Sequence, residues 1–144
     1  MPADFSDDVP DLEAAPPTEF LYVGSRRWIK TYLETNDGKW RRVYFLVDSG
    51  AKRCYMLDRF RSGLKCTSQS SVFGDMWKLD VIHSSIQVFR SEEAQNANIR
   101  NINLVGTVFI DTVALFDDFR SKRFFVLPRN SDNVAKESLH LQKE

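Results

Sequence analysis

Short β-type runs rich in apolar and aromatic residues, separated by turn residues, follow one another from Phe20 onward. Trp28–Glu34 ends at the turn NDG of residues 36–38, and Asp-Gly between two apolar runs is a strong hairpin signal. Trp40–Val47 ends at a second turn, DSG at residues 48–50, and Arg53–Leu57 follows. Because side chains alternate between the two faces of a strand, these runs predict three strands of an antiparallel meander.

The second half continues the pattern less regularly. The polar stretch Arg59–Gly74 predicts a loop, and Glu92–Asn101 predicts an insertion with one helical turn. Ser131 fits the N-cap of a short helix over Asp132–Gln142. Further strands are expected at Met76–Ile82, Ser85–Phe89, Leu104–Thr112, Val113–Phe116 and Arg123–Leu127. Strands at this spacing predict a mainly β barrel or sandwich, with the helix plugging one opening.

Composition sets the size and limits of this domain. The chain has 144 residues, 42% of them hydrophobic, which suits one folded domain with its own core. Residues 1–19 contain four prolines and six acids but no Lys or Arg, so we expect a flexible acidic tail before a domain over residues 20–144. Without a signal peptide or an apolar run long enough to span a bilayer, a cytoplasmic location is expected.

The residues that usually perform catalysis or bind metals form no recognisable motif. Cys54 and Cys66 are too widely spaced for a zinc pair, and His83 and His140 lie in no ligand or nucleophile pattern. The acidic pair at residues 117–118 fits a turn between strands better than a pair of catalytic carboxylates. We therefore expect a protein that is not an enzyme and that holds neither a metal nor a cofactor.

The formal net charge is zero, but the charges are segregated along the chain. Residues 20–62 hold ten bases against four acids, directly after the acidic segment. Such a basic strip could face an anionic surface, where each base contributes about 1 kcal/mol, or the acidic tail could lie against it. The near-neutral total makes nucleic acid an unlikely partner.

Residues 38–57 (GKWRRVYFLVDSGAKRCYML) resemble the first hairpins of pleckstrin homology (PH) domains. Members of that family carry a basic and aromatic second strand, then a turn and a Leu-Tyr-Tyr-like third strand. The residues that match in type or position are Trp40, Arg41, Arg42, Tyr44, Phe45 and Val47, with residues 54–57 (CYML) as the third strand. Residues 123–127 (RFFVL) are similar to the strand before the family's helix. The resemblance implies a seven-stranded antiparallel barrel or sandwich capped by one C-terminal helix.

The chain departs from the PH pattern where phosphoinositides bind. In binding members, a base late in the first strand joins a Lys-x-Arg pair on the second. Arg41 takes the first place of that pair, but Val43 stands at the second, and Glu34 or Thr35 replaces the base of the first strand. Phosphates favour several charge-assisted donors, so the resemblance implies a degenerate inositol site. The helix also lacks the tryptophan that family members bury there.

A more distant resemblance is to the sub-compartment proteins of the apicomplexan inner membrane complex. Those proteins are anchored by N-terminal acylation and use a degenerate domain of this kind for protein contacts. The Met-Pro start of this chain lacks the glycine that N-myristoylation requires.

Three functions follow from these observations. We expect first a scaffold that recruits a protein partner at a membrane or cytoskeletal structure. Its candidate protein-binding anchors are the aromatic residues near strand ends and loops, Trp28, Phe60, Phe73 and Trp77. The alternative is a sensor of phosphoinositides or other anionic lipids, with candidate lipid-binding residues Lys39, Arg41, Arg42, Lys52 and Arg53. A third function, an enzyme or small-ligand barrel, needs a polar pocket that the sequence does not display.

Overall fold

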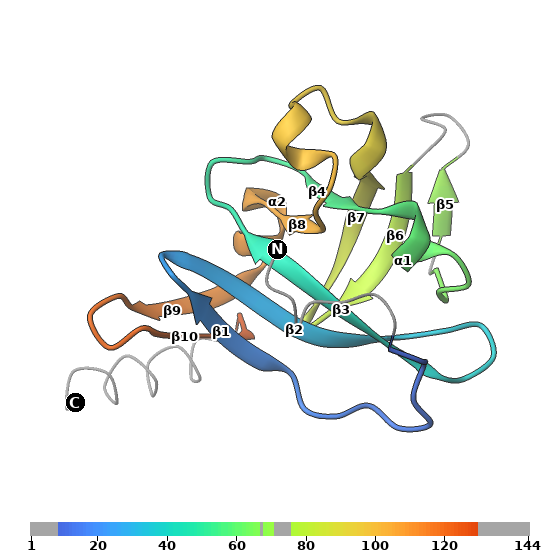
Figure 1. Ribbon diagram of the computed structural model, residues 1–144, viewed down its shortest axis with the longest axis horizontal. Helices are drawn as coiled ribbons and strands as arrows, with labels where there is room; N and C mark the ends of the chain where they lie inside the picture. The colour runs from blue at the N-terminus through green and yellow to red at the C-terminus, as the bar shows by residue number, and fades with distance from the viewer. Residues whose placement is uncertain (1–8, 67, 71–75, 130–144) are drawn as a thin grey trace.

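The computed structural model of the protein describes residues 9–66, 68–70 and 76–129, and within them the fold is mainly β (Figure 1). Eight strands form one sheet in the order β1-β2-β3-β8-β4-β7-β6-β5. Their bounds are Glu19–Val23 (β1), Arg26–Glu34 (β2), Trp40–Val47 (β3), Cys54–Met56 (β4), Ser68–Ser70 (β5), Met76–Val81 (β6), Ser84–Arg90 (β7) and Leu104–Val105 (β8). A separate hairpin pairs β9 (Val113–Asp118) with β10 (Arg123–Pro128). The mainly β fold expected from the sequence is confirmed.

The closed antiparallel barrel of seven strands is not what the described residues form. The end of β3 pairs in parallel with β8, so β8 lies between β3 and β4, and β4 pairs in parallel with β7. The β9–β10 hairpin shares no ladder with the large sheet. The expected helix over Asp132–Gln142 falls outside the described residues. Barrel closure was a wrong prediction: the outer strands of the sheet, β1 and β5, share no ladder with each other among the described residues, so the sheet is open.

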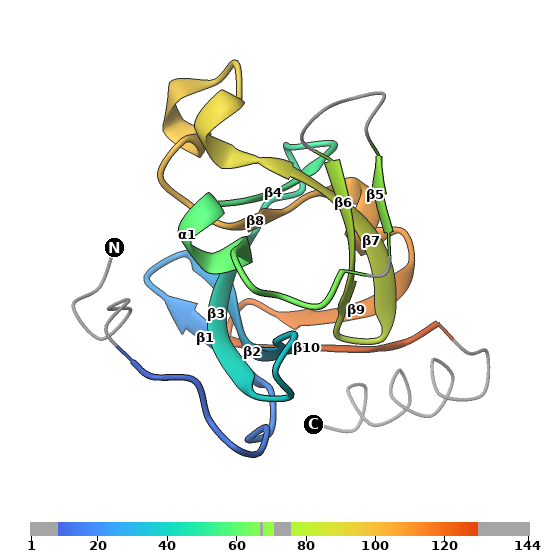
Figure 2. The same ribbon diagram turned by 90° about the vertical axis from the view of Figure 1, so that its right-hand side faces the viewer.

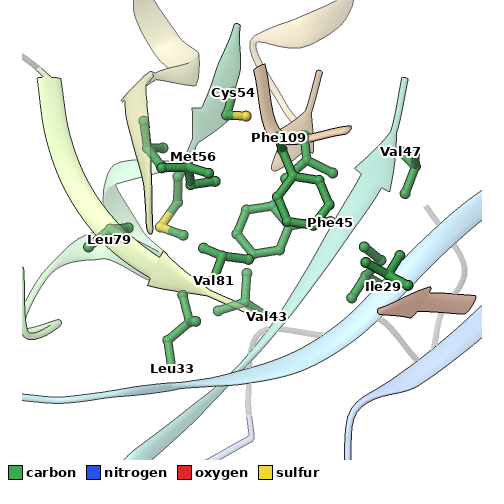
Figure 3. Close-up of a cluster of buried hydrophobic side chains, with 14 of the residues drawn as sticks. Ile29, Leu33, Val43, Phe45, Val47, Cys54, Met56, Leu79, Val81 and Phe109 are labelled. Atoms are coloured by element: carbon green, nitrogen blue, oxygen red, sulfur yellow. The ribbon is translucent and has the colours of Figure 1, made fainter. Parts of the chain in front are cut away.

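Both faces of β3 are covered, which explains why its last five residues are all buried. Val43, Phe45 and Val47 face a large core that also holds Ile29 of β2, and Figure 3 shows these side chains pointing toward one another. The alternate residue Leu46 packs on the other face in a smaller cluster. Alternation along the strand therefore divides its side chains between two cores, and Figure 2 shows the strands arranged around the larger one.

The hairpin β9–β10 packs on β1 through aromatic rings. The ring centroid of Phe124 lies 5.5 Å from that of Phe20 and 5.5 Å from that of Tyr22, both edge to face. Such pairs stabilise by about 0.5–1.5 kcal/mol beyond the area they bury. These contacts cover the large core on a side where no ladder of backbone hydrogen bonds links the hairpin to β1.

Short helices occur in two segments that the sequence predicted as a strand and as a loop. The strand predicted over Leu104–Thr112 ends after Val105, and helix α2 (Thr107–Ile110) follows because the amides of Thr107 and Val108 donate to the carbonyls of Ala51 and Lys52. The predicted loop Arg59–Gly74 contains the end of helix α1 (Asp58–Arg61) and the strand β5. The insertion expected after Phe89 forms two 3-10 turns, η2 (Ser91–Glu93) and η3 (Ala97–Ile99).

The described part of the acidic N-terminal segment lies against the domain. Leu12 and Trp40 exchange two backbone hydrogen bonds of 2.8 Å, which adds a bridge to the edge of β3. Glu19 already belongs to β1 and pairs with Lys30 of β2. Residues 9–19 therefore contribute backbone pairing and charge to the first three strands.

Candidate functional site

The five bases expected to bind lipid lie at opposite ends of β3. Lys39 and Arg41 stand at its start, whereas Lys52 and Arg53 follow its end. A strand of eight residues spans about 23 Å at roughly 3.3 Å per residue. The structure therefore divides the expected basic patch into two separate groups.

The first group is held by contacts within the chain. The Arg41 guanidinium makes two hydrogen bonds of 3.1 Å to the Asp11 carboxylate, one from Nε and one from Nη2. Its Nη1 donates 2.9 Å to the carbonyl of Phe60 and also donates to that of Ser62. An arginine with this many partners orders the N-terminal segment and the α1 turn around it.

Further carboxylates of the acidic segment reach the same strip of bases. Lys39 Nζ lies 3.9 Å from the Glu13 carboxylate, and Lys30 Nζ lies 3.0 Å from that of Glu19. The hydrogen bond to Glu19 raises the pKa of Lys30. Of the two arrangements considered for the acidic segment, the structure shows the one in which it lies against the strip.

Arg42, the remaining base of β3, faces the other side of the strand. Its guanidinium carbon lies 5.2 Å from the centroid of the Tyr44 ring, a distance that suits a cation–π contact. Arg42 therefore packs over the smaller core, apart from both groups of bases.

Two of the four aromatic anchors are buried, which corrects their expected role. Trp28 is 4% exposed within the smaller core, and Trp77 is 2% exposed in the larger one, beneath the guanidinium of Arg61. Neither ring is available to a partner, because alternation on β2 and β6 turns it inward. Phe60 is half-buried against the large core, and Phe73 lies outside the described residues.

The second group of bases borders a hollow of about 550 Å³. Its floor is the parallel pair β4–β7, where Tyr55 is paired with Phe89. The neighbours of Tyr55 in β4, Cys54 and Met56, are buried, so alternation turns Tyr55 and Phe89 outward into the hollow. The hollow is lined by Ala51, Lys52, Arg53, Tyr55, Phe89, Arg90, Glu93, Ala94, Gln95, Asn96 and Ile99, and is called the β4–β7 pocket below.

Arg53 and the two aromatic rings form one cluster in this pocket. The Arg53 guanidinium carbon lies 4.7 Å from the centroid of the Phe89 ring, and the Tyr55 and Phe89 centroids are 6.3 Å apart, with the two rings tilted against each other. A guanidinium over an aromatic face keeps donors available for an anion. The cluster thus presents charge and apolar surface together.

The opposite wall is fixed by ionic and backbone contacts. Arg90 donates to both carboxylate oxygens of Asp58 and to Glu93, the last at 2.9 Å. The Asn96 side chain accepts from the amide of Asn98 at the start of η3, and Arg100 Nε donates 2.9 Å to the carbonyl of Ala94. The pocket's one carboxylate, Glu93, is therefore already engaged.

Gly106 positions the bases of the pocket. A β-carbon at this residue would lie 2.6 Å from the Arg53 carbonyl oxygen and closer still to that of Ala51. The segment that carries Lys52 and Arg53 thus packs directly on the backbone of Gly106, before α2 begins. Only glycine permits this approach.

The lining of the pocket combines cations, amides and aromatic rings. No histidine or cysteine lines it, and Glu93 is paired. The sequence did not display this polar lining, whose cations and amides suit anion binding. Across the described residues, no group of three His, Cys, Asp or Glu side chains could hold a metal ion.

Both thiols are poor nucleophiles where they stand. Burial raises the pKa of Cys54, which is 1% exposed, and also that of the half-buried Cys66. A thiol with a raised pKa is largely protonated near neutral pH and reacts slowly. Neither cysteine lines the β4–β7 pocket.

Sequence reasoning found two residues of this pocket and missed the rest. Lys52 and Arg53 were candidates for lipid binding, whereas Tyr55 and Phe89 were assigned only to strands. The alternation of Cys54, Tyr55 and Met56 already indicates that Tyr55 faces away from the core. The parallel pairing that brings Phe89 beside it has no local signal in the sequence.

None of the helices in the described ranges has the length and apolar character needed to cross a membrane. No protein-family model, curated protein or solved structure matches this chain.

Proposed function

We propose that this chain is a non-catalytic, PH-like binding module that recruits a protein partner, and that the β4–β7 pocket holds an acidic segment of that partner. The cations of the pocket would neutralise carboxylate or phosphate groups, and its rings would cover apolar side chains next to them. Aromatic and arginine residues are the commonest sources of binding energy in protein interfaces. A cytoplasmic location belongs to the same proposal, and it accords with two unpaired thiols.

The observation that carries this proposal is the state of Lys52 and Arg53. Both side chains are exposed, and neither forms an ion pair within the described part of the chain. They stand beside two aromatic rings on a rigid floor of paired strands. Bases in such a setting lose little entropy when an acidic ligand binds, since Arg53 is already held by Phe89.

The contacts of β3 support a degenerate phosphoinositide site. Val43, at the place of the second base, is 0% exposed and belongs to the large core. Arg41 is bound by Asp11 and by two backbone carbonyls. A phosphoinositide at the start of β3 would therefore have to displace the acidic segment and would meet only one base of the usual pair.

Binding of acidic peptides tests the proposal. An array of octapeptides rich in Glu and Asp, with and without phosphoserine, would select a probe for titration into isotope-labelled protein. We expect the amide resonances of Lys52, Arg53, Tyr55 and Phe89 to shift together. The double variant Lys52→Glu, Arg53→Glu should lose binding, because it places like charges beside the ligand.

A control with the same change in net charge makes the result specific. Arg26→Glu, Arg120→Glu alters two exposed bases elsewhere and should leave peptide binding unchanged. Equal loss in both double variants, or shifts clustered away from β4 and β7, would show that the pocket is not the binding site.

A further inference from the structure

Few large hydrophobic side chains are exposed in the described residues, and one of these side chains protrudes. Phe119, at the turn between β9 and β10, is 60% exposed, and Val23, at the end of β1, is 38% exposed. Figure 1 shows the β1–β2 turn and the β9–β10 turn on the same side of the molecule. Residues 23–27 and 117–123 are called the hairpin tip below.

Asp117 holds the two turns together. Its carboxylate accepts a hydrogen bond from the Tyr22 hydroxyl and another of 2.9 Å from Arg27 Nη1. Burial and the bond to Asp117 raise the pKa of Tyr22 to about 12. The Tyr22 ring also lies 6.4 Å from that of Phe119, so the end of β1 lies beside the β9–β10 turn.

Contacts within the turn hold Phe119 in its exposed position. Asp118 Oδ1 accepts from the Ser121 amide at 3.3 Å, and the Lys122 amide donates to the carbonyl of Phe119 at 3.4 Å. Lys122 has φ of 56°, a left-handed conformation that reverses the chain. Its ammonium lies 3.8 Å from the centroid of the Phe119 ring.

Basic side chains surround this apolar point. Arg26, Arg120, Lys122 and Arg123 are exposed, and Arg27 is paired with Asp117. The tip therefore carries five bases against two acids, Asp117 and Asp118, in a chain whose net charge is zero. The β4–β7 pocket includes none of these residues, and Phe119 stands at the turn of a hairpin with its side chain exposed.

We propose that the hairpin tip docks on an anionic bilayer surface, with Phe119 in the interfacial region and the surrounding bases against lipid head groups. A convex apolar point fits between lipids, whereas a protein partner would need a complementary cavity. Aromatic side chains favour the interfacial depth of a membrane, and nearby Lys and Arg are attracted by its negative surface potential. This membrane contact is a function separate from the β4–β7 pocket, which it leaves open.

Vesicle binding of the full chain tests the proposal. Sedimentation with phosphatidylcholine vesicles that contain phosphatidylserine should show binding at low ionic strength, weakened as salt screens the charges. The double variant Arg26→Glu, Arg120→Glu should bind at least roughly 25-fold more weakly, because each base near the surface contributes about fivefold. Phe119→Ser should weaken binding by about tenfold or more, through loss of its apolar area.

The control is Lys52→Glu, Arg53→Glu, which changes net charge equally and should keep vesicle binding. Absence of wild-type binding, equal binding to pure phosphatidylcholine, or equal loss in both double variants would each overturn the proposal. Association of the chain with itself that depends on Phe119 and needs no lipid would also overturn it. Thermal unfolding by circular dichroism verifies that every variant is folded.

Fluorescence locates the tip in the bilayer. Phe119→Trp adds an exposed indole to a chain in which Trp28 and Trp77 are buried and Trp40 is half-buried. Anionic vesicles should shift its emission to the blue, and lipids brominated near the head group should quench it. Val108→Trp, at an exposed site on α2, is the matched control and should show neither effect. Bound protein without quenching at residue 119 would refute insertion of the tip.

Discussion

The two ends of β3 carry similar pairs of bases and use them in opposite ways. At the start, Lys39 and Arg41 meet Glu13 and Asp11, and Arg41 also binds two backbone carbonyls. Beyond the end, Lys52 and Arg53 remain exposed at the rim of a pocket. The partners that decide this difference lie about 30 residues from the bases they neutralise, so a cluster of bases in the sequence does not by itself locate a binding surface.

The comparison also separates two kinds of charge. Arg41 has a structural role, since its hydrogen bonds join the N-terminal segment, β3 and the α1 turn. Arg53 has its guanidinium on an aromatic face and donors left for a ligand. Substitutions at the start of β3 should therefore affect stability, and substitutions past its end should affect binding.

Gly106→Ala should have the largest effect, because it damages the pocket end of β3 directly. The added methyl group would collide with the carbonyls of Ala51 and Arg53. We expect a loss of about 1–3 kcal/mol in the free energy of unfolding, measured by urea denaturation, together with weaker acidic-peptide binding. Gly50→Ala is the control, since its β-carbon would meet only a side-chain oxygen of Asp48 at 3.1 Å. Equal stability of the two variants would mean that segment 51–53 moves freely from α2.

Arg41→Ala should have the second-largest effect and should distinguish the roles of the two ends of β3 most clearly. It removes the donors bound to Asp11 and to the carbonyls of Phe60 and Ser62, and bonds to a charged group contribute about 1.5–3 kcal/mol each when fully formed. Because the Arg41 side chain is 22% exposed, we expect a total near the lower limit, about 1–2 kcal/mol. Arg41→Lys should recover little of it, since an ammonium lacks the forked donors.

Lys52→Ala is the comparison for that variant and should change the unfolding free energy by less than about 0.5 kcal/mol. It should instead weaken acidic-peptide binding, which Arg41→Ala leaves intact. The reverse outcome, with Lys52 important for stability and Arg41 for binding, would invert the roles assigned to the two ends.

Lys39→Ala should have the smallest effect. Its ammonium stands 3.9 Å from Glu13, and the side chains of Lys39 and Glu13 are 44% and 88% exposed. Exposed pairs contribute about 0–1 kcal/mol and weaken in salt. A chemical-denaturation midpoint within error of the wild type, at low and high salt, is expected; a clear loss would show that the acidic segment is held by charge along its whole length.

Local patterns in the sequence predicted the strands around the first hairpin well. The turn at residues 36–38 appears in the structure as expected, and the predicted strand Trp40–Val47 forms with Val43, Phe45 and Val47 facing one core. These features depend on neighbours in the chain, so a single sequence contains them. The mainly β class follows from the same signals.

Features that depend on distant pairing could not be predicted in this way. The insertion of β8 between β3 and β4 interrupts the expected meander, and the backbone of Gly106 packs on Ala51 where α2 begins in place of an expected strand. The same applies to the pocket, because Phe89 reaches Tyr55 only through the parallel pair β4–β7. The hairpin tip was missed because the exposure of Phe119 depends on how the β9–β10 hairpin packs on β1. The acids at residues 117–118 give no local signal of that packing.

The raised pKa values of Cys54 and Cys66 have a practical consequence for labelling chemistry. Maleimides and methanethiosulfonates attack thiolates, so the chain's two native thiols should react slowly at neutral pH. A cysteine introduced by Phe119→Cys, or by Val108→Cys on α2, would react first in an otherwise native background. Spin labels or dyes could then be placed at single sites without removing either native cysteine and disturbing the core that Cys54 helps to fill.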